Sequence, residues 1–119
     1  MDCGRKDNIM AKILPRKART LDVYKRTGAR MRLCKEAATL AVCAMSGVLK
    51  ADELAKAHRA LTLLNEACSA AEDRMFQDHP YIGNEYINVF YGALSGSPAS
   101  ALDGEIRELA KDFADGFFA

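Results

Sequence analysis

The sequence predicts an all-α protein, a four-helix bundle-like domain made of a long helical hairpin and two shorter C-terminal helices. The main observation is an apolar stripe whose residues follow one another at steps of three and four, which keeps them on one side of a helix. Its members are Leu54, Ala57, Leu61, Leu64, Cys68, Ala71 and Met75. A second long helical pattern precedes this stripe. The one segment with strand character, Tyr86 to Tyr91, has no partner strand elsewhere in the sequence.

Length and composition indicate one folded domain. The chain has 119 residues, of which 50% are hydrophobic and 28% are charged, as in an ordinary globular protein. We expect residues 1–19 to form a basic flexible arm, because they combine six basic residues with Gly4 and Pro15 and show little periodicity. Residues 20–119 are then expected to form a single helical domain.

The cysteines and the uncharged segments bear on metals, membranes and location. Cys3, Cys34, Cys43 and Cys68 match no zinc-binding spacing, so we predict no metal and no cofactor. We expect the cysteines to be buried free thiols, which are typical of a protein in the reducing cytoplasm. The longest uncharged run, thirteen residues from Ala37 to Leu49, is shorter than the roughly 20 residues that a membrane-spanning helix needs, so no membrane association is expected.

The hairpin helices have recognisable ends. The first is expected to start at Thr20, whose hydroxyl suits an N-cap, and to end near Gly47. Its predicted core residues are Tyr24, Met31, Cys34, Ala38, Ala41 and Met45. Gly28 weakens this helix by about 1 kcal/mol relative to Ala, unless a neighbouring segment packs closely against it. The second helix carries the stripe described above and ends before Pro80, which disfavours helical geometry at His79.

Two shorter helices are expected to complete the bundle. The first spans residues 84–94, where apolar residues share a helical face. The second begins at Ser100, where the pattern Ser-x-x-Asp is typical of a capping box. Its apolar stripe consists of Leu102, Ile106, Leu109, Phe113 and Phe117.

Each hairpin helix also has a second apolar face, which makes self-association an open question. The predicted interface residues are Leu33, Ala37, Leu40 and Ala44 on the first helix, and Ala60, Leu63 and Ala67 on the second. Either the C-terminal helices or another copy of the chain is expected to cover these faces, since a helix that is apolar nearly all round is buried on two sides. A homodimer is therefore one expectation.

The charges divide unevenly along the chain. Residues 1–35 hold 11 Lys and Arg against three Asp, whereas residues 36–119 hold 6 Lys and Arg against 13 Asp and Glu. The candidate binding residues of this basic half are Arg16, Lys17, Arg19, Lys25, Arg26, Arg30 and Arg32. They could contact the phosphates of a nucleic acid or an acidic protein partner. Alternatively, they meet the acidic C-terminal helix of the same or a second copy.

The end of the second helix carries one motif with possible chemistry. Its sequence is Arg74, four further residues, His79, one residue and Tyr81. The pattern resembles the signature of HEPN-type ribonucleases, which are small all-helical dimers often found in toxin–antitoxin and defence systems. The resemblance implies that Arg74 and His79 lie near a dimer interface and cut RNA without a metal. The His would move the proton of the 2′-hydroxyl, and the Arg would stabilise charge on the phosphate.

A structural interpretation of the same motif is also open. Arg74 would pair with Asp78 one helical turn further on, His79 would cap the helix end and Tyr81 would pack.

The sequence as a whole favours a small non-enzymatic helical interaction protein of the regulator or inhibitor type, a class that includes proteins carried by phages and plasmids. It would bind a protein or a nucleic acid through its basic N-terminal half. Two alternatives remain: a metal-independent ribonuclease that uses Arg74 and His79, and a structural subunit of a homo-oligomeric assembly.

Overall fold

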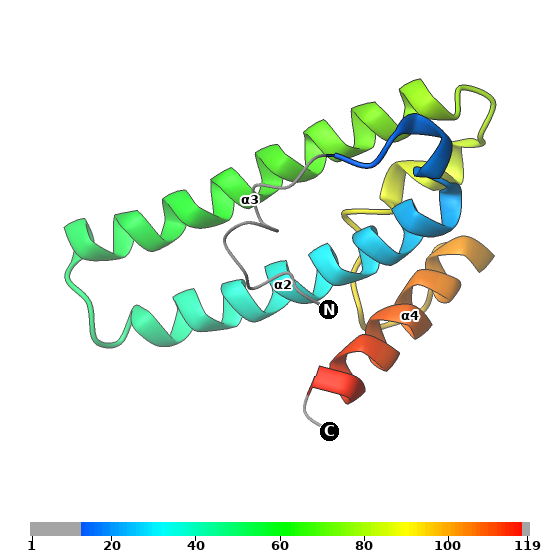
Figure 1. Ribbon diagram of the computed structural model, residues 1–119. Coiled ribbons are helices and arrows are strands. Elements are labelled where there is room, and N and C mark those ends of the chain that lie inside the picture. Colours follow the sequence, from blue (N-terminus) through cyan, green and yellow to red (C-terminus); the bar gives the residue numbers. More distant parts are fainter. Residues whose placement is uncertain (1–12, 118–119) are drawn as a thin grey trace.

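A computed structural model describes residues 13–117 of the chain, and over that range it is helical and contains no strand (Figure 1). The predicted all-α class is therefore confirmed. The elements in chain order are the 3₁₀ helix η1 (Arg16–Ala18), the α-helices α2 (Leu21–Met45) and α3 (Ala51–Asp78), the 3₁₀ helix η2 (Asn84–Asn88) and the α-helix α4 (Ala101–Phe117).

The helices α2 and α4 begin where their capping residues predict. The Thr20 hydroxyl accepts a hydrogen bond from the Val23 N–H at 3.3 Å and caps α2. At α4 the Ser100 hydroxyl accepts a bond from the Asp103 N–H, and the Asp103 carboxylate accepts one from the Ala99 N–H, both at 3.0 Å. These bonds satisfy backbone donors that a helix leaves free at its first turn.

The predicted stripe on α3 is the side of this helix that faces the protein. Cys68 and Met75 are buried and the other five members are half-buried, while the residues between Leu54 and Cys68 that lie off the stripe are exposed. The spacing of apolar residues thus correctly orients the longest helix.

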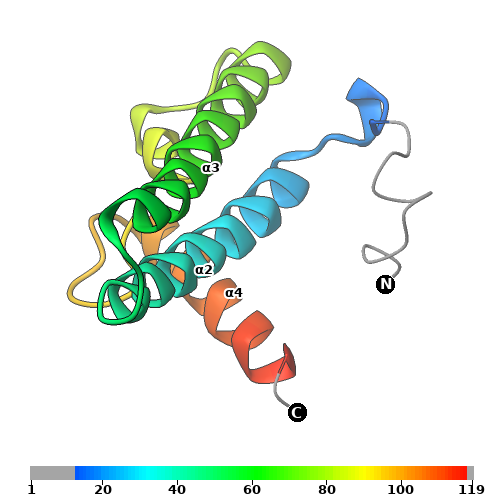
Figure 2. The ribbon, with the colours of Figure 1, turned by 90° about the vertical axis from the view of Figure 1, so that its left-hand side faces the viewer.

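The predicted core residues of α2 are only partly right. Cys34 and Ala41 are exposed, whereas Ala29 and Val42 are buried in their place. Figures 1 and 2 show the reason, because α2 lies between α3 and α4 over its first half but contacts only α3 over its second half. Since the neighbours change along α2, one stripe does not describe its buried side.

A four-helix bundle is not confirmed, because residues 84–94 do not form the expected α-helix. The segment is a 3₁₀ helix over Asn84–Asn88 and then turns. Side chains of α2 bind this segment: Arg32 donates to the carbonyls of Asn88, Val89 and Ala93, and Lys35 donates to that of Phe90.

A basic flexible arm is not confirmed either. Residues 13–19, the part of the predicted arm that the structure describes, include η1 and contact the end of α3 through Arg16 and Arg19. Residues 1–12 of the arm, with Cys3, lie outside the described residues.

The hydrophobic core lies where α2, α3, α4 and the η2 segment meet. Its largest fully buried side chains are Phe90, Met75, Ile106, Val89 and Cys68. The rest of the hairpin, residues 37–63, extends beyond this core as two helices (Figure 1). Within residues 13–117 no helix has the length and apolar character needed to cross a bilayer.

Gly28 lies where the chain at the end of η2 crosses α2. This close approach explains why a glycine stands inside the helix. A Cβ atom at position 28 would lie 2.5 Å from both Val89 Cγ1 and the Val89 carbonyl oxygen. We expect Gly28→Ala to lower the free energy of unfolding by about 1–3 kcal/mol. This overpacking outweighs the gain in helix propensity of about 1 kcal/mol. Urea unfolding measures the change.

Gly104 in α4 provides the matched control, because its added Cβ would meet only Pro98 side-chain atoms at 3.7 Å, an ordinary contact. Gly104→Ala is expected to stabilise the protein by about 0.5–1 kcal/mol. A Gly28→Ala variant as stable as this control would contradict the close packing of η2.

Candidate functional site

The C-terminal end of α3 is bound by basic residues of the N-terminal segment. Arg19 forms a two-pronged ion pair with Asp78, with Nε and Nη2 at 2.6 and 3.0 Å from the carboxylate oxygens. The Tyr24 hydroxyl donates to the same carboxylate at 2.5 Å. Arg16 donates to the Gln77 and Asp78 carbonyls at 3.0 and 3.3 Å. Positive charges, and side chains that donate hydrogen bonds to the last carbonyls, are favourable at a helix C-terminus. These contacts therefore stabilise the end of α3.

The ionisation of this cluster follows from its hydrogen bonds. The bonds from Arg19 and then from Tyr24 hold the pKa of Asp78 well below its usual range. The bond to Asp78 raises the pKa of Arg19, and burial, together with the bond to Asp78, raises the pKa of Tyr24. The Arg19–Asp78 pair is therefore charged at neutral pH, with a neutral Tyr24 beside it.

Among the described residues, no hydrogen bond or ring contact joins the motif residues Arg74, His79 and Tyr81 to one another. His79 caps α3, and its Nε2 lies 2.8 Å from the Arg19 carbonyl oxygen. Tyr81 is 99% exposed. Arg74 is exposed on α3 and lines a cleft that His79 does not line.

The structural interpretation of the motif holds for one residue of three. The predicted capping of α3 by His79 is confirmed. The predicted Arg74–Asp78 pair is wrong, because Arg16, Arg19 and Tyr24 occupy the Asp78 carboxylate. Tyr81 is too exposed for the packing that was expected of it.

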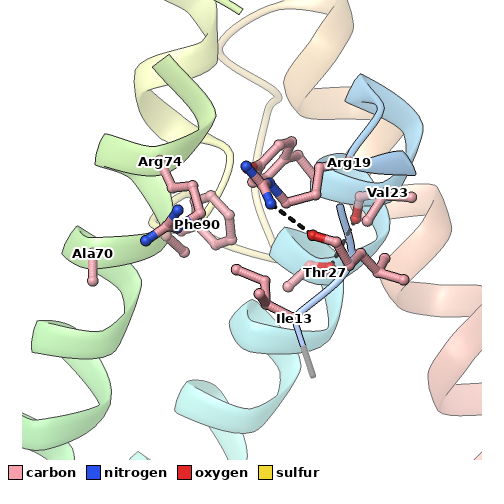
Figure 3. A pocket seen from close by; sticks show the side chains of 10 residues that line it. Ile13, Arg19, Val23, Thr27, Ala70, Arg74 and Phe90 are labelled. Carbon is pink, nitrogen blue, oxygen red and sulfur yellow. Dashed lines mark hydrogen bonds between the residues drawn. The ribbon is translucent and has the colours of Figure 1, made fainter. Parts of the chain in front are cut away.

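The cleft beside Arg74 has a volume of about 390 Å³ and lies between α2, α3 and the N-terminal segment. Figure 3 shows Ala70 and Arg74 on α3 and Val23 and Thr27 on α2. The lining residues are Ile13, Leu14, Arg19, Val23, Tyr24, Thr27, Ala70, Ala71, Arg74 and Phe90. Arg19 is bound to Asp78, and the Thr27 hydroxyl donates to the Val23 carbonyl. Among the described residues, no carboxylate or imidazole lines the cleft to act as a base.

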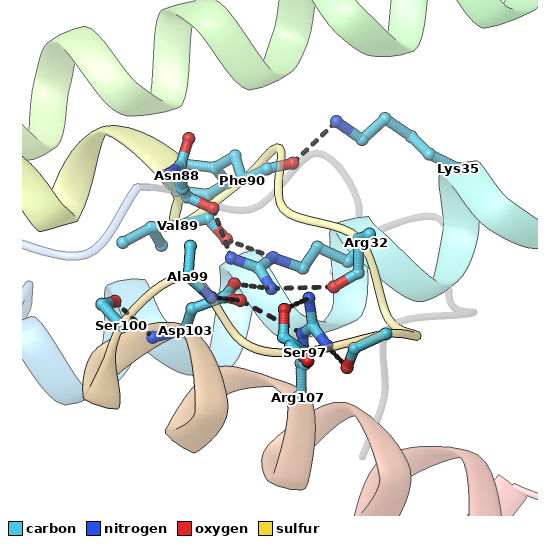
Figure 4. A network of polar contacts seen from close by, with 12 residues as sticks. Arg32, Lys35, Asn88, Val89, Phe90, Ser97, Ala99, Ser100, Asp103 and Arg107 are labelled. Atoms are coloured by element: carbon cyan, nitrogen blue, oxygen red, sulfur yellow. Dashed lines mark hydrogen bonds and ion pairs between the residues drawn. The ribbon is translucent and has the colours of Figure 1, made fainter.

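A second polar cluster lies inside the protein and includes one of the predicted binding residues. Arg32 is only 3% exposed, and its Nη1 lies 2.7 Å from Asp103 Oδ1. Arg107 lies 3.1 Å from the other oxygen of Asp103. Figure 4 shows the Arg32 guanidinium between the 88–93 segment and α4. Arg32 is therefore no surface contact for a phosphate, and the sequence prediction must be corrected for this residue.

The charge of Asp103 is stabilised in spite of its burial. Burial raises the pKa of this carboxyl, but the Ala99 N–H and the Arg32 guanidinium outweigh that effect and hold the pKa below its ordinary value. The Arg32–Asp103 ion pair thus joins α2 to α4 across the core, where the Ala99 N–H donates to the other oxygen of Asp103 and Arg32 also donates to the Val89 carbonyl.

Most of the remaining basic side chains also have partners within the chain. Lys25 pairs with Glu105 of α4 at 2.9 Å, and Arg26 pairs with Asp22 at 2.9 Å. The Arg30 guanidinium stacks 4.1 Å from the centre of the Phe113 ring. Among residues 13–117 Lys17 has no such contact, and it is the exception within the predicted set. The uneven charge distribution is largely balanced inside one copy of the chain.

The predicted interface residues are left uncovered, with one exception. Leu33 is half-buried against the core. The C-terminal helix covers none of the other six, which are exposed: Ala37, Leu40, Ala44, Ala60, Leu63 and Ala67. Leu40 is 67% exposed and Leu63 is 52% exposed. Cys34 and Cys43 are exposed too, so the predicted burial of thiols holds only for Cys68 among those described.

Two hollows accompany these exposed leucines. One, of about 520 Å³, lies between α2 and α4 and is lined by Arg30, Leu33, Cys34, Ala37, Phe113, Ala114 and Phe117. We call it the α2/α4 groove. The other, of about 580 Å³, lies on the outer face of α3 and is lined by Ala55, Lys56, His58, Arg59, Thr62, Leu63 and Glu66.

The sequence offered one usable signal for the polar clusters that its interpretation missed. Asp78 is an acidic residue in the last turn of a helix, where the helix dipole disfavours a negative charge unless a cation is near. That position predicts a basic partner. The pairing of Arg32 with Asp103 has no comparable local signal, because the two residues lie on different helices.

Comparison with protein-family models, with curated proteins and with solved structures finds no match to this chain. In the described part of the chain, no group of three or more His, Cys, Asp or Glu residues is placed to hold a metal ion.

Proposed function

We propose that this chain is a small non-enzymatic helical interaction protein whose partner is another protein, bound through the outer face of α3. The observation that carries the proposal is Leu63. It is 52% exposed in the middle of a long helix and lies in a hollow whose rim carries Lys56, Arg59 and Glu66. An apolar anchor surrounded by charged groups of both signs is typical of protein interfaces that form between folded partners.

The arrangement of the motif residues supports a binding role over catalysis. His79 is engaged at the end of α3 by the Arg19 carbonyl, and Arg74 lines a cleft without a base. A ribonuclease that uses this pair would need both side chains at one phosphate. The ribonuclease alternative therefore rests on the sequence pattern alone.

The charges support a protein partner over a nucleic acid. Arg16, Arg19 and Lys25 of the basic half contact acidic residues or carbonyls of the same chain. Binding to a phosphate backbone depends on basic groups that are free to replace counterions. The α3 hollow, by contrast, mixes basic and acidic residues, which suits a protein surface of mixed charge.

Site-specific cross-linking tests this proposal. A photoreactive benzophenone amino acid at Thr62, within the α3 hollow, is expected to yield one cross-linked protein in the cells from which the chain derives. Leu63→Glu is expected to weaken binding of that protein at least about tenfold, measured by calorimetry on the purified pair. Val48→Glu is the matched control, because Val48 is also exposed but lies in the hairpin turn outside the hollow.

Three results would overturn the proposal. A cross-link that Leu63→Glu leaves unchanged would place the partner elsewhere, and a nuclease-sensitive product would indicate a nucleic acid. Metal-independent RNA cleavage that His79→Ala abolishes would replace the proposal with the ribonuclease alternative.

A further inference from the structure

The α2/α4 groove continues into an uncharged surface along α2. Leu33, Cys34 and Ala37 form the α2 side of the groove, and Phe113 and Phe117 form the α4 side. Beyond the end of α4 the same side of α2 continues with exposed apolar residues, namely Leu40, Ala41 and Ala44. These residues are exposed in a single copy of the chain, and Figure 1 shows that α4 does not run beside the second half of α2.

The absence of charge on this surface identifies the kind of occupant. In a two-fold symmetric contact each patch meets the same patch on the other copy, so any charge on the axis meets its own sign. Residues 37–49 contain no charged side chain. The exposed side of α2 beyond α4 therefore carries no charge that would oppose self-pairing.

The shape of the surface is also suited to a second copy. Ala37, Ala41 and Ala44 are small and leave a shallow path along α2, while Leu40 projects from the same side. Small residues let two helices approach closely, and large residues then fill the space between them. In an antiparallel contact of two α2 helices centred near Leu40, each leucine meets the alanines of the other copy.

The groove lacks the groups that would orient a small ligand. Ligand pockets hold a few placed polar groups that fix the orientation of the molecule. The one charged group in this lining is Arg30, and its guanidinium is stacked on Phe113. A helix of a second copy needs no such groups, because its backbone hydrogen bonds are satisfied internally.

We infer that the α2/α4 groove and the exposed face of α2 beyond it form the contact surface of a symmetric homodimer. The inference goes beyond the proposed function and does not depend on it. It assigns the outer face of α2 to a second copy and leaves the outer face of α3 for the other protein. The two faces can be tested separately.

Light scattering over a range of concentrations tests the dimer. We expect the wild-type chain to have about twice the mass of the 13.0 kDa monomer. Leu40→Glu places two like charges at the centre of the contact, and it is expected to weaken dimerisation at least about 100-fold. Since Leu40 is exposed in one copy, this variant keeps its helical circular dichroism. Val48→Glu adds the same charge at the hairpin turn and is expected to remain dimeric.

Alkylation of Cys34 gives a second readout that does not depend on a variant. Cys34 is exposed in one copy and lines the groove, so its labelling, followed by peptide mass spectrometry, is expected to slow as the protein concentration rises. In Leu40→Glu the rate is expected to be independent of concentration.

The outcomes separate this inference from the proposed function. A wild-type chain that is monomeric at all concentrations overturns the dimer, as does a dimer that Leu63→Glu disrupts and Leu40→Glu leaves intact. Loss of the cross-link at Thr62 without a change in mass would instead overturn the proposed function and leave the dimer standing.

Discussion

Arg32→Ala is expected to lower the free energy of unfolding by about 3–5 kcal/mol, the range found when one partner of a buried ion pair is removed. Arg32 is almost fully buried and lies 2.7 Å from the Asp103 carboxylate. Its guanidinium also donates to the carbonyls of Asn88, Val89 and Ala93. The substitution leaves Asp103 with Arg107 as its one remaining basic partner and removes a donor from each of these carbonyls. Urea unfolding at pH 7 measures the loss.

Arg26→Ala is the matched control for this prediction. Arg26 is on the same helix and also pairs with an aspartate, Asp22, but both side chains are exposed. An exposed pair one helical turn apart contributes only about 0.3–0.5 kcal/mol. If the two variants lost stability equally, the buried Arg32–Asp103 pair would not stabilise the protein more than the exposed Arg26–Asp22 pair, and the prediction would be wrong.

Acid is expected to unfold the protein by protonating Asp78 and Asp103 together. Each carboxyl has a folded-state pKa below its unfolded value, Asp78 through Arg19 and Tyr24, and Asp103 through the Ala99 N–H and Arg32 in spite of burial. The stability that such a group contributes is fully present above the unfolded pKa of about 3.9 and is lost as the pH falls through the folded pKa. We therefore expect the urea midpoint to change little between pH 7 and about 5 and to fall below about pH 4.

Glu72 acts in the opposite direction. Burial and then the nearby Asp73 raise the pKa of this carboxyl. A group of this kind favours folding most below its unfolded pKa and loses that contribution as the pH rises through the folded pKa. Glu72 therefore offsets a part of the acid effect, but it is one carboxyl, whereas Asp78 and Asp103 both act in the other direction.

Asp78→Asn tests the assignment of the acid effect. This variant keeps the size of the side chain but loses its charge, so it is expected to be less stable at pH 7 and to have a shallower pH dependence than the wild type. Asp112→Asn, on the exposed side of α4, is the control and is expected to reproduce the wild-type curve. An Asp78→Asn curve parallel to that of the wild type would contradict the role of Asp78.

Both polar clusters hold segments against the same end of the hairpin. Asp78 anchors the N-terminal segment, and Arg32 anchors the 88–93 segment and α4. At the other end of the hairpin these contacts leave the outer faces of the two helices uncovered, and Leu40 and Leu63 are exposed there. The surfaces that we propose for binding thus exist because the internal contacts gather at the opposite end.

The sequence alone determined the helices and the orientation of the longest one. Thr20 and Ser100 start α2 and α4, and the stripe from Leu54 to Met75 faces inward, as their patterns predict. These features arise from local interactions, because capping and the 3.6-residue period involve residues only a few positions apart. The second apolar faces of the hairpin were visible in the sequence for the same reason, but the C-terminal helix, one of the two covers expected for them, leaves them exposed except at Leu33.

Only the tertiary structure decided how the charged residues and the segment after α3 are used. Arg32 donates to Val89 over 57 positions and Arg19 donates to Asp78 over 59 positions, and no local pattern encodes such pairs. Arg32 and Lys35 bind the carbonyls of residues 88–90 and 93, where the segment turns and does not form the helix that periodicity predicts. A basic run that is typical of a binding surface therefore becomes, in the folded chain, a set of internal contacts. Long-range hydrogen bonds outweigh the local preference because they satisfy buried charge and buried backbone at once.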